Sequence, residues 1–245
     1  MAQSIDIVLV GFRSEEFLPR LLEDIEAFTA LPHIVHYFDN TGNPRTLSAL
    51  WNDLAAAGTA DYLAIMNPDI ALSPSWDRRL VRALRFDPTL GIATPDPIGS
   101  SPTAAPMPSV ATMRELAKEL AGNQEVSTGD VQFYLPVLAR RTWEALRGVD
   151  ERMRFYMSDS DLLHRAKARL GLRAGRVHSC PVWHRGSAST GEAIRRKEIN
   201  QSLEYDTSFA VWREVREGRM KDWDLLTDAE RSAVRSDPKY GRMGA

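Results

Sequence analysis

The first 85 residues alternate between short apolar runs and amphipathic segments, and this alternation constrains the fold more than any other feature. The runs at residues 5–12, 33–38 and 62–66 have the near-continuous hydrophobicity of strands buried on both faces of a parallel sheet. Apolar residues recur at helical spacing in the segments between and after them. Strand–helix alternation with short connections favours right-handed crossovers. The sequence therefore predicts an α/β, Rossmann-like fold with a mostly parallel sheet flanked by helices.

Polar residues follow each of these three strands at its carboxyl end, at residues 11–13, 39–42 and 67–69. In open parallel sheets, ligands bind at the carboxyl ends of the strands. The third of these segments is the turn Asn67-Pro68-Asp69, which presents one carboxylate directly after a buried strand. Such a turn is a common way to hold a divalent metal beside a phosphate. Because Asn, Pro and Asp are also ordinary turn formers, a plain turn is the alternative interpretation.

The second half of the chain is less regular. Strands are predicted at residues 91–94, 129–139 and 173–178, and a helix is predicted at residues 159–170. Residues 95–108 contain five prolines, too many for a helix or a central strand. We interpret this segment as a mobile loop that acts as a lid over a site. Residues 190–217 have a helical pattern, and the rest of the chain is polar and charged.

Charge is unevenly distributed, although the formal net charge is only −2. Residues 1–139 hold 9 Lys and Arg against 17 Asp and Glu, whereas residues 140–197 hold 14 against 6. A compact basic segment in a mildly acidic protein predicts contact with a phosphate or another anion. A solvated arginine-rich surface is the alternative.

The composition is that of a globular protein, with 245 residues of which 43% are hydrophobic, enough for one large domain or one domain with a small appendage. The single cysteine, Cys180, excludes an internal disulfide framework and a cysteine-rich zinc site. No apolar run reaches the roughly 18 residues that a membrane span needs, and the first residues lack a signal-peptide pattern. We therefore expect a cytoplasmic protein without a membrane span.

Six segments in order along the chain resemble the inverting family-2 glycosyltransferases of the GT-A fold, and within them the rhamnosyltransferase-like branch. They are residues 8–18, Phe38-Asp39-Asn40-Thr41, Met66-Asn67-Pro68-Asp69-Ile70, Gly148-Val149-Asp150-Glu151-Arg152, residues 157–165 and His184-Arg185-Gly186-Ser187. The resemblance covers roughly residues 4–190. It implies a GT-A domain at residues 1–190, followed by a helical, charged C-terminal extension at residues 191–245.

The resemblance implies a metal-dependent transferase that moves a sugar, with inversion, from a nucleotide-diphosphate sugar to a hydroxyl acceptor. The residues implied in nucleotide-sugar binding are Gly11, Phe12, Arg13, Asp39, Asn40, Asn67 and Arg185. The implied metal ligands are Asp69 and His184. Oxygen ligands suit Mg²⁺ or Mn²⁺, and an imidazole shifts the preference toward Mn²⁺. On local sequence alone, His184 beside Trp183 is interpreted as a structural histidine, and the resemblance reverses that interpretation.

The segment at residues 157–165 resembles the stretch that carries the catalytic base of this family. We expect Asp159 to be the base, with Asp161 as the alternate. Both carboxylates also suit the first turn of a helix, so a structural role stays open. Ser158 stands where the family has a glutamate, which leaves the choice between the two aspartates open. Arg13 replaces the usual asparagine, which together with the proline-rich loop leaves the donor open.

Three other functions compete with this one. A nucleotidyltransferase can share the strand order and a metal carboxylate, although residues 11–16 hold only one glycine where a phosphate loop would lie. A non-catalytic nucleotide-sugar or carbohydrate-binding protein fits the absence of a glutamate at Ser158. A nucleic-acid-binding protein would use the basic segment. The acceptor is open among a glycan, a protein side chain, a lipid-linked sugar and a modified nucleic-acid base, and the basic segment favours an anionic one.

Overall fold

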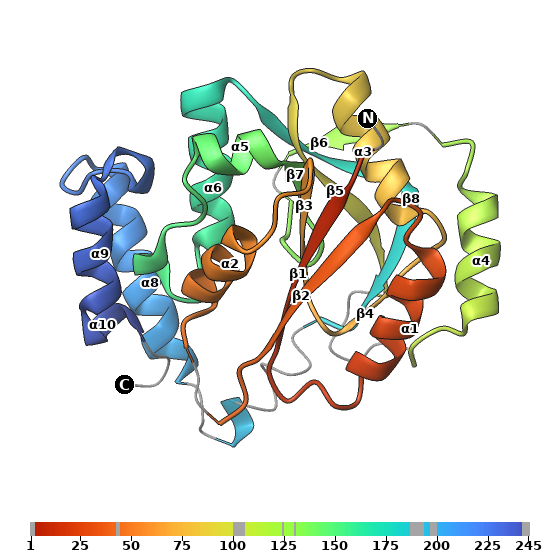
Figure 1. Cartoon of the computed structure of the whole chain (residues 1–245), viewed down its shortest axis with the longest axis horizontal. Coiled ribbons are helices and arrows are strands. Elements are labelled where there is room, and N and C mark those ends of the chain that lie inside the picture. Colours follow the sequence, from red (N-terminus) through yellow and green to blue (C-terminus); the bar gives the residue numbers. More distant parts are fainter. Residues whose placement is uncertain are drawn as a thin grey trace.

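The computed structural model describes residues 3–42, 45–99, 106–123, 125–129, 131–186, 194–196 and 200–241. Within these ranges the centre of the molecule is an eight-stranded sheet with helices on both faces (Figure 1). The strand order is β2-β1-β3-β7-β5-β8-β4, and β6 pairs with β8. The strands are β1 (Ile5–Gly11), β2 (His33–Asp39), β3 (Tyr62–Met66), β4 (Ile70–Ala71), β5 (Leu90–Ile98), β6 (Val126–Thr128), β7 (Val137–Ala139) and β8 (Arg173–His184).

The helices connect these strands and then continue beyond the sheet. They are α1 (Leu18–Phe28), α2 (Leu47–Ala56), α3 (Trp76–Phe86), α4 (Val110–Glu119), α5 (Arg140–Ala145), α6 (Ser158–Leu170), α8 (Gln201–Arg216), α9 (Asp228–Ser236) and α10 (Pro238–Gly241), with short 3₁₀ turns η1 (Glu151–Met153) and η2 (Trp223–Leu225). Helices α8, α9 and α10 lie together at one end of the molecule, beside α6 (Figure 1). Among the described helices, none combines the length and the apolar character that crossing a bilayer requires.

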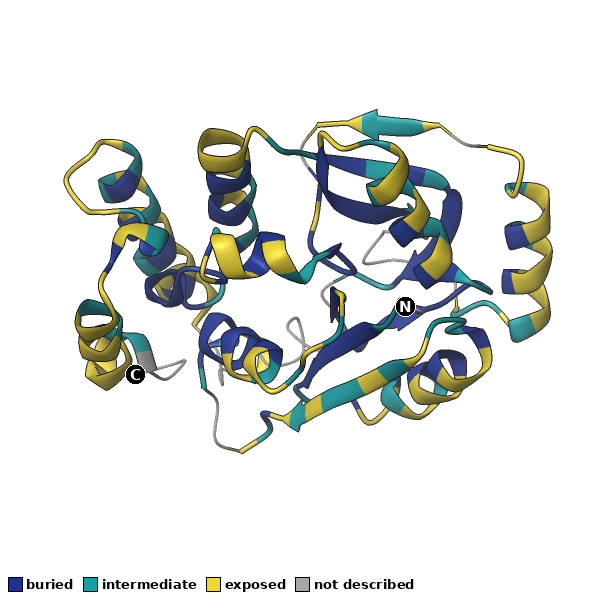
Figure 2. Ribbon diagram, turned by 45° about the horizontal axis from the view of Figure 1, so that its top comes forward, coloured by how far each residue is buried: buried dark blue, intermediate teal, exposed yellow. Residues whose placement is uncertain are grey.

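The predicted α/β fold is confirmed. Strand β1 pairs in parallel with β2 and β3, and β5 pairs in parallel with β8, whereas β7, β4 and β6 join their neighbours antiparallel. Every residue of β1 and β3 is buried, as their near-continuous apolar runs predict. The edge strand β2 is partly exposed (Figure 2).

The two faces of the sheet carry separate hydrophobic cores. Alternate residues of β1 and β3 pack with α1 and α3 on one face. The remaining apolar residues of these strands pack with α2, α5 and α6 on the other face. This two-sided burial explains why the central strands show no alternation of apolar and polar residues. It also fixes the carboxyl ends of the strands rigidly at one edge of the sheet.

The predicted loop at residues 95–108 is wrong over its first four residues, because β5 continues to Ile98 and pairs with β8. β5 pairs with β7 only at Ile92 and Ala93, so beyond that point one edge of β5 has no strand partner among the described residues. Alternate residues of a strand point their N–H groups to opposite edges, so Pro95 and Pro97 can both face the unpaired edge without removing a ladder hydrogen bond. The part of the proposed lid at residues 100–105 lies outside the described residues.

Two other strand predictions need correction. The strand predicted at residues 129–139 is present only at its end, as β7, and a turn that carries Tyr134 precedes it. The short strand β6 lies just before the predicted range and was not predicted. β8 is longer than predicted and reaches His184, after a register shift opposite Pro95 and Asp96. β8 pairs with β5 from Arg173 to Trp183, and its other edge pairs with β6 near its start and with β4 at its end.

Candidate functional site

A cavity of about 460 Å³ lies at the carboxyl ends of β1 and β3. Its lining comes from segments far apart in the sequence: Val10, Phe12, Asn40, Leu47, Trp51, Asn67, Pro68, Asp69, Gln132, Phe133, Tyr134, Phe155, Tyr156, Met157, Ser158, Asp159, Ser160 and His184. We call it the strand-end cavity. It contains six of the residues predicted from the sequence, namely Phe12, Asn40, Asn67, Asp69, Asp159 and His184.

Asp69 and His184 are brought together by the short antiparallel pair β4–β8. Ile70 lies opposite His184 in this ladder, and the Arg185 N–H donates to the Asp69 carbonyl at 3.0 Å. The His184 Nε2 atom lies 3.5 Å from Asp69 Oδ1. Both residues are buried, with 9% and 3% of their surface exposed. A buried carboxylate and a buried imidazole thus face the same cavity.

The surroundings of His184 fit a metal ligand. Its Nε2 atom is buried and makes no hydrogen bond within the described part of the chain. Tyr134 stacks on the imidazole, with ring centroids 4.9 Å apart and planes at 14°, and its hydroxyl donates to the Pro95 carbonyl at 2.5 Å. Burial raises the pKa of the Tyr134 hydroxyl, which therefore stays a neutral donor. The tyrosine holds the imidazole in one orientation, and a buried nitrogen without a partner is a group that a cation can satisfy.

The protein supplies few ligands of its own at this point. Within the described ranges there is no group of three or more His, Cys, Asp and Glu side chains that could hold a metal. Asp69 and His184 would therefore share an ion with water or with phosphate oxygens. That arrangement is usual for Mg²⁺ in phosphate-transfer sites, and the imidazole also suits Mn²⁺.

The two aspartates at the start of α6 have different environments. Asp159 lines the strand-end cavity and is half-buried, and burial raises the pKa of its carboxyl. Asp161 is fully buried, and its carboxylate accepts from Arg165 at 2.6 Å and from Arg216 at 3.2 Å. Burial raises the pKa of Asp161 to about 6, and the Arg165 guanidinium opposes this shift. The structure brings Asp159 to the cavity and does not bring Asp161 there.

The backbone before α6 explains how Asp159 reaches the cavity. Arg154 and Met157 have positive φ values of 41° and 65°, an uncommon conformation for residues other than glycine. The chain between them turns Phe155 and Tyr156 into the cavity wall. Ser158, which replaces the glutamate of the resembling family, is buried, and its Oγ lies 2.7 Å from Ser48 Oγ of α2. This contact ties the start of α6 to the opposite side of the cavity.

The other predicted nucleotide contacts lie in loops around the cavity or shape those loops. The Asp39 carboxylate is exposed and accepts from the Thr41 N–H at 2.9 Å. Asn40 is buried and its amide bonds the Arg45 backbone at 2.9 and 2.8 Å, so this side chain is committed to the loop. At Gly11 a Cβ atom would come within 2.7 Å of the Tyr37 hydroxyl, which explains the glycine.

Two predicted arginines approach the site without lining it. The Arg13 N–H donates to Thr41 Oγ1 at 3.0 Å, which joins the loops after β1 and β2. Arg185 follows His184, and its guanidinium lies over the Phe17 ring at 5.5 Å and 3.6 Å from Glu16. Gly11, Arg13, Asp39, Asp161 and Arg185 are thus the predicted site residues that the structure does not place in the cavity lining.

Sequence reasoning missed most of the aromatic lining. Tyr134 fell in a segment predicted as a strand, and no local pattern pairs it with His184. Trp51 of α2 lines the cavity as well, and its place at helical spacing gives no sign of this. Phe155 and Tyr156 directly precede the segment with Asp159, and this adjacency was the one available signal.

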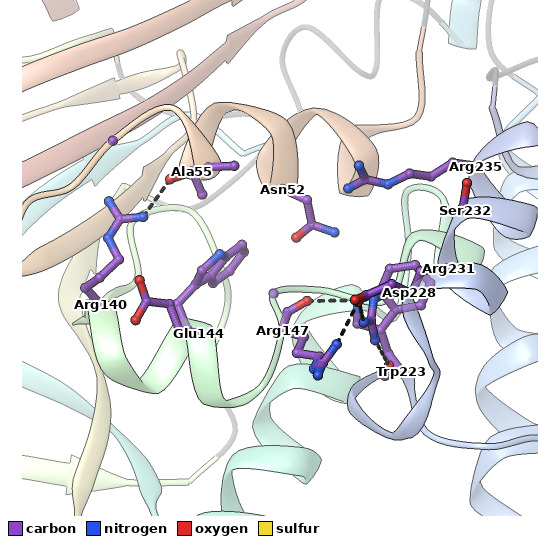
Figure 3. A pocket seen from close by; sticks show the side chains of 14 residues that line it. Asn52, Ala55, Arg140, Glu144, Arg147, Trp223, Asp228, Arg231, Ser232 and Arg235 are labelled. Atoms are coloured by element: carbon purple, nitrogen blue, oxygen red, sulfur yellow. Dashed lines mark hydrogen bonds and ion pairs between the residues drawn. The ribbon is translucent and has the colours of Figure 1, made fainter.

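A second cavity of about 540 Å³ lies between α2, α5 and α9 and is lined by four arginines (Figure 3). We call it the arginine-lined cavity. Arg140 donates to the Ala55 carbonyl at 2.6 Å, and Arg147 and Arg231 both contact the Asp228 carboxylate (Figure 3). Arg235 bonds Glu151 at 2.6 Å. Each of these guanidiniums therefore already has a partner within the protein.

Other arginines of the basic segment at residues 140–197 also form ion pairs with carboxylates of the protein. Its ion pairs include Arg140–Asp6, Arg147–Asp228, Arg152–Asp150, Arg154–Glu204, Arg165–Asp161, Arg169–Asp222 and Arg173–Asp87. The charge excess that suggested an external anion is thus largely paired inside the protein. Several of these pairs join the sheet domain to α8, α9 and η2.

No protein-family model matches the chain, and no curated protein is similar to it in sequence. Solved structures do resemble it. One is a mannosyltransferase from Pyrobaculum calidifontis in complex with GDP-Man and Mn²⁺, at 14% identity and a TM-score of 0.55, covering 84% of this chain and 63% of that one. Another is GalNAc-T7 with UDP, GalNAc and Mn²⁺, at 13% identity and a TM-score of 0.56, covering 75% of this chain and 44% of that one.

A third is glucosyl-3-phosphoglycerate synthase from Mycobacterium tuberculosis with Mn²⁺, UDP and phosphoglyceric acid. It has 13% identity and a TM-score of 0.52, and the match covers 78% of this chain and 74% of that one. The protein has the GT-A fold. At this level of identity the likeness concerns the fold alone, and the chain spans less than two thirds of the mannosyltransferase and of GalNAc-T7.

Proposed function

We propose that the protein is a metal-dependent, inverting glycosyltransferase that moves a sugar from a nucleotide-diphosphate sugar to a hydroxyl acceptor. The observation that carries this proposal is one cavity of a GT-A fold that contains the Asp69–His184 pair and the Asp159 carboxylate. The similar structures hold GDP-Man or UDP together with Mn²⁺, which supports a donor of this class. Membership of the rhamnosyltransferase-like branch and a cytoplasmic location stay predictions.

Asp69 and His184 are the residues that we assign to the metal. A divalent ion held there supplies Lewis-acid neutralisation of the charge that develops on the departing diphosphate. Buried positions suit this task, because water screens the charges less there. Tyr134 keeps the imidazole oriented for this role through its stacking contact.

Asp159 is the residue that we assign as the catalytic base. Its carboxylate faces the cavity. The base must lie there, because it takes a proton from the acceptor hydroxyl in the displacement step. A raised pKa brings a carboxylate closer to the operating pH and makes it a better base. We assign Asp161 a structural role, because its oxygens are bonded to Arg165 and Arg216.

For the nucleotide, we assign the exposed carboxylate of Asp39 to the ribose or the base. Gly11, Phe12, Arg13 and Asn40 would form the surrounding loops, and Asn67 and Arg185 would contact the donor beside the metal. The division into a GT-A domain at residues 1–190 and an extension at residues 191–245 belongs to the same proposal.

A thermal-shift screen of nucleotide sugars, with and without Mn²⁺, tests the proposal. We expect one donor to raise the melting temperature only when the metal is present, because a ligand that binds the folded state alone stabilises it. Hydrolysis of that donor then distinguishes an enzyme from a binding protein that has lost turnover. A protein that no nucleotide sugar stabilises, with or without metal, contradicts the proposed function.

A further inference from the structure

A continuous row of aromatic rings leads out of the strand-end cavity. It runs from Phe155 through Tyr156, Tyr205 and Phe209 to Trp212, and we call it the aromatic row. Successive ring centroids are 4.9, 5.6, 5.8 and 5.8 Å apart. The first two rings line the cavity beside Asp159, and the last three belong to α8. The row therefore connects the proposed catalytic site to the exposed rings of Tyr205 and Phe209 on α8.

Buried contacts of α8 residues beside the row hold it in place. The Glu204 carboxylate accepts from Arg154 at 2.8 Å, and the Ser208 hydroxyl donates to the Met153 carbonyl at 2.6 Å. Both α8 residues are fully buried, and they fix the helix to the strained segment that forms the cavity wall. The three rings of α8 follow at positions i, i+4 and i+7, so they form one stripe along the helix.

The middle of the row is open to solvent. Tyr205 is 42% exposed and Phe209 is 37% exposed, and their rings are nearly parallel, at 8°. A single exposed aromatic residue needs no explanation. Nearer the cavity the rings meet edge to face, with Tyr156 at 69° to Phe155 and at 64° to Tyr205. Neighbouring rings that continue from a cavity still form a contiguous apolar surface, and such surfaces mark binding sites.

We propose that the aromatic row binds the acceptor, and that this acceptor is a neutral oligosaccharide that extends from Asp159 along α8. This inference rests on the proposed function, because it takes the strand-end cavity as the place of sugar transfer. A pyranose ring has an apolar face of C–H groups and a polar rim, so it can stack on an aromatic face while its hydroxyls stay in water.

The charge of α8 favours a neutral chain over a nucleic acid. The helix carries three acidic and two basic residues. One of the basic residues, Arg216, is bonded to Asp161 and Asp222. Binding of single-stranded nucleic acid also uses aromatic stacking, but it needs cations along the phosphate backbone. Within α8, the aromatic row has the stacking surface without an excess of positive charge.

Binding of cellohexaose, maltohexaose, mannohexaose and chitohexaose to the full chain, without donor or metal, tests the inference by calorimetry. We expect at least one hexasaccharide to bind. The double variant Tyr205→Ala, Phe209→Ala should weaken that binding by about tenfold or more, because two stacking contacts are lost. Phe86→Ala is the matched control, since this exposed ring lies on α3, and it should leave binding unchanged. Tyr205→Phe, which keeps the ring, should also bind normally and shows that the surface needs aromaticity.

The outcomes separate the two proposals. Hexasaccharide binding that depends on the aromatic row, in a protein that hydrolyses no donor, supports the row and contradicts the proposed function. If the protein hydrolyses donor but binds no hexasaccharide, the assignment of the aromatic row to the acceptor is overturned. Hexasaccharide binding that the double variant leaves intact overturns it as well. Two further results also overturn it: salt-sensitive binding of an oligonucleotide in its place, or a change of oligomeric state in the double variant measured by analytical ultracentrifugation.

Discussion

The two cavities of this protein differ in what their charged groups do. The arginine-lined cavity holds four guanidiniums, and each is bonded to a carboxylate or a carbonyl of the protein. The strand-end cavity holds fewer charged groups, but they include a half-buried carboxylate and a buried imidazole nitrogen that makes no hydrogen bond in the described residues. Their volumes are similar, at about 540 and 460 Å³. Charge density alone therefore does not identify a ligand site, whereas a buried imidazole nitrogen that makes no hydrogen bond and faces a cavity beside a carboxylate favours one.

The two cavities also differ in how their charged groups affect the free energy of unfolding. Removing one partner of a buried ion pair costs about 3–5 kcal/mol, because the other charge is left unsatisfied. Arg154 and Glu204 form such a buried pair, which thus holds α8 to the segment before α6. The strand-end cavity keeps its polar groups at some cost in stability, as is common where a site must bind a ligand.

The largest effect on activity is expected for Asp69→Ala. Losing this carboxylate should lower donor hydrolysis by about 10³-fold or more, since the metal supplies several kcal/mol of transition-state stabilisation. The metal-dependent thermal shift should vanish as well. Asp228→Ala, which removes a carboxylate from the arginine-lined cavity, is the matched control and should leave hydrolysis unchanged. Normal turnover in Asp69→Ala would remove the basis for the metal assignment.

Asp159→Asn should keep donor binding and slow sugar transfer by about 10²- to 10⁴-fold, the range of a lost general base. The neighbouring variant Asp161→Asn should act mainly on stability. It leaves Arg165 and Arg216 without their carboxylate and should cost about 3–5 kcal/mol in the free energy of unfolding, measured by denaturant titration. If Asp161→Asn instead folds normally and has lost transfer, the base assignment is reversed.

The raised pKa of Asp159 gives a further test by pH. A base must be deprotonated, so kcat/KM should rise with pH through a pKa above the usual value of about 3.9 and then level off. Because burial raises this pKa on folding, the protonated group favours the folded state at low pH and this contribution is lost as pH rises through the folded pKa. At neutral pH Asp159→Asn should therefore melt at a slightly higher temperature than the wild type. A lower melting temperature would contradict the raised pKa.

The smallest effect is expected in the arginine-lined cavity. Arg147→Ala breaks a pair in which Arg147 is 49% exposed and Asp228 is 94% exposed. Exposed pairs of this kind contribute about 0.2–1 kcal/mol, so the free energy of unfolding should fall by no more than that. Donor hydrolysis should not change. A loss of turnover in this variant would show that the comparison of the two cavities is wrong.

Local sequence predicted the elements whose cause is local. The strand at residues 62–66 has the predicted bounds, because a short apolar run flanked by polar turns is sufficient to define it. The failure at Pro95 and Pro97 has a tertiary cause, since only the pairing of β5 shows that one of its edges is free. The pairing of Arg140 with Asp6 also joins distant parts of the chain, and for this reason a charge count misjudged the basic segment.

For the site, the sequence brought Asp69, Asp159 and His184 together only through a family resemblance. The structure supplies the physical reason why Asp69 lies beside His184, which is the β4–β8 ladder. The stacking of Tyr134 on His184 could not be predicted, because Tyr134 lies in the turn before β7 and His184 at the end of β8, and no local pattern joins these segments.

The β4–β8 ladder has one more consequence, which concerns the order in which parts of the molecule unfold. It joins residues from the first and the last third of the chain, and such long-range contacts are the slowest to form in folding. An ion shared by Asp69 and His184 would fasten these two segments to each other. Chelation should then speed amide hydrogen exchange in Ile70, Ala71 and the end of β8 while β1 stays protected, so that metal occupancy reports whether the last strand has docked.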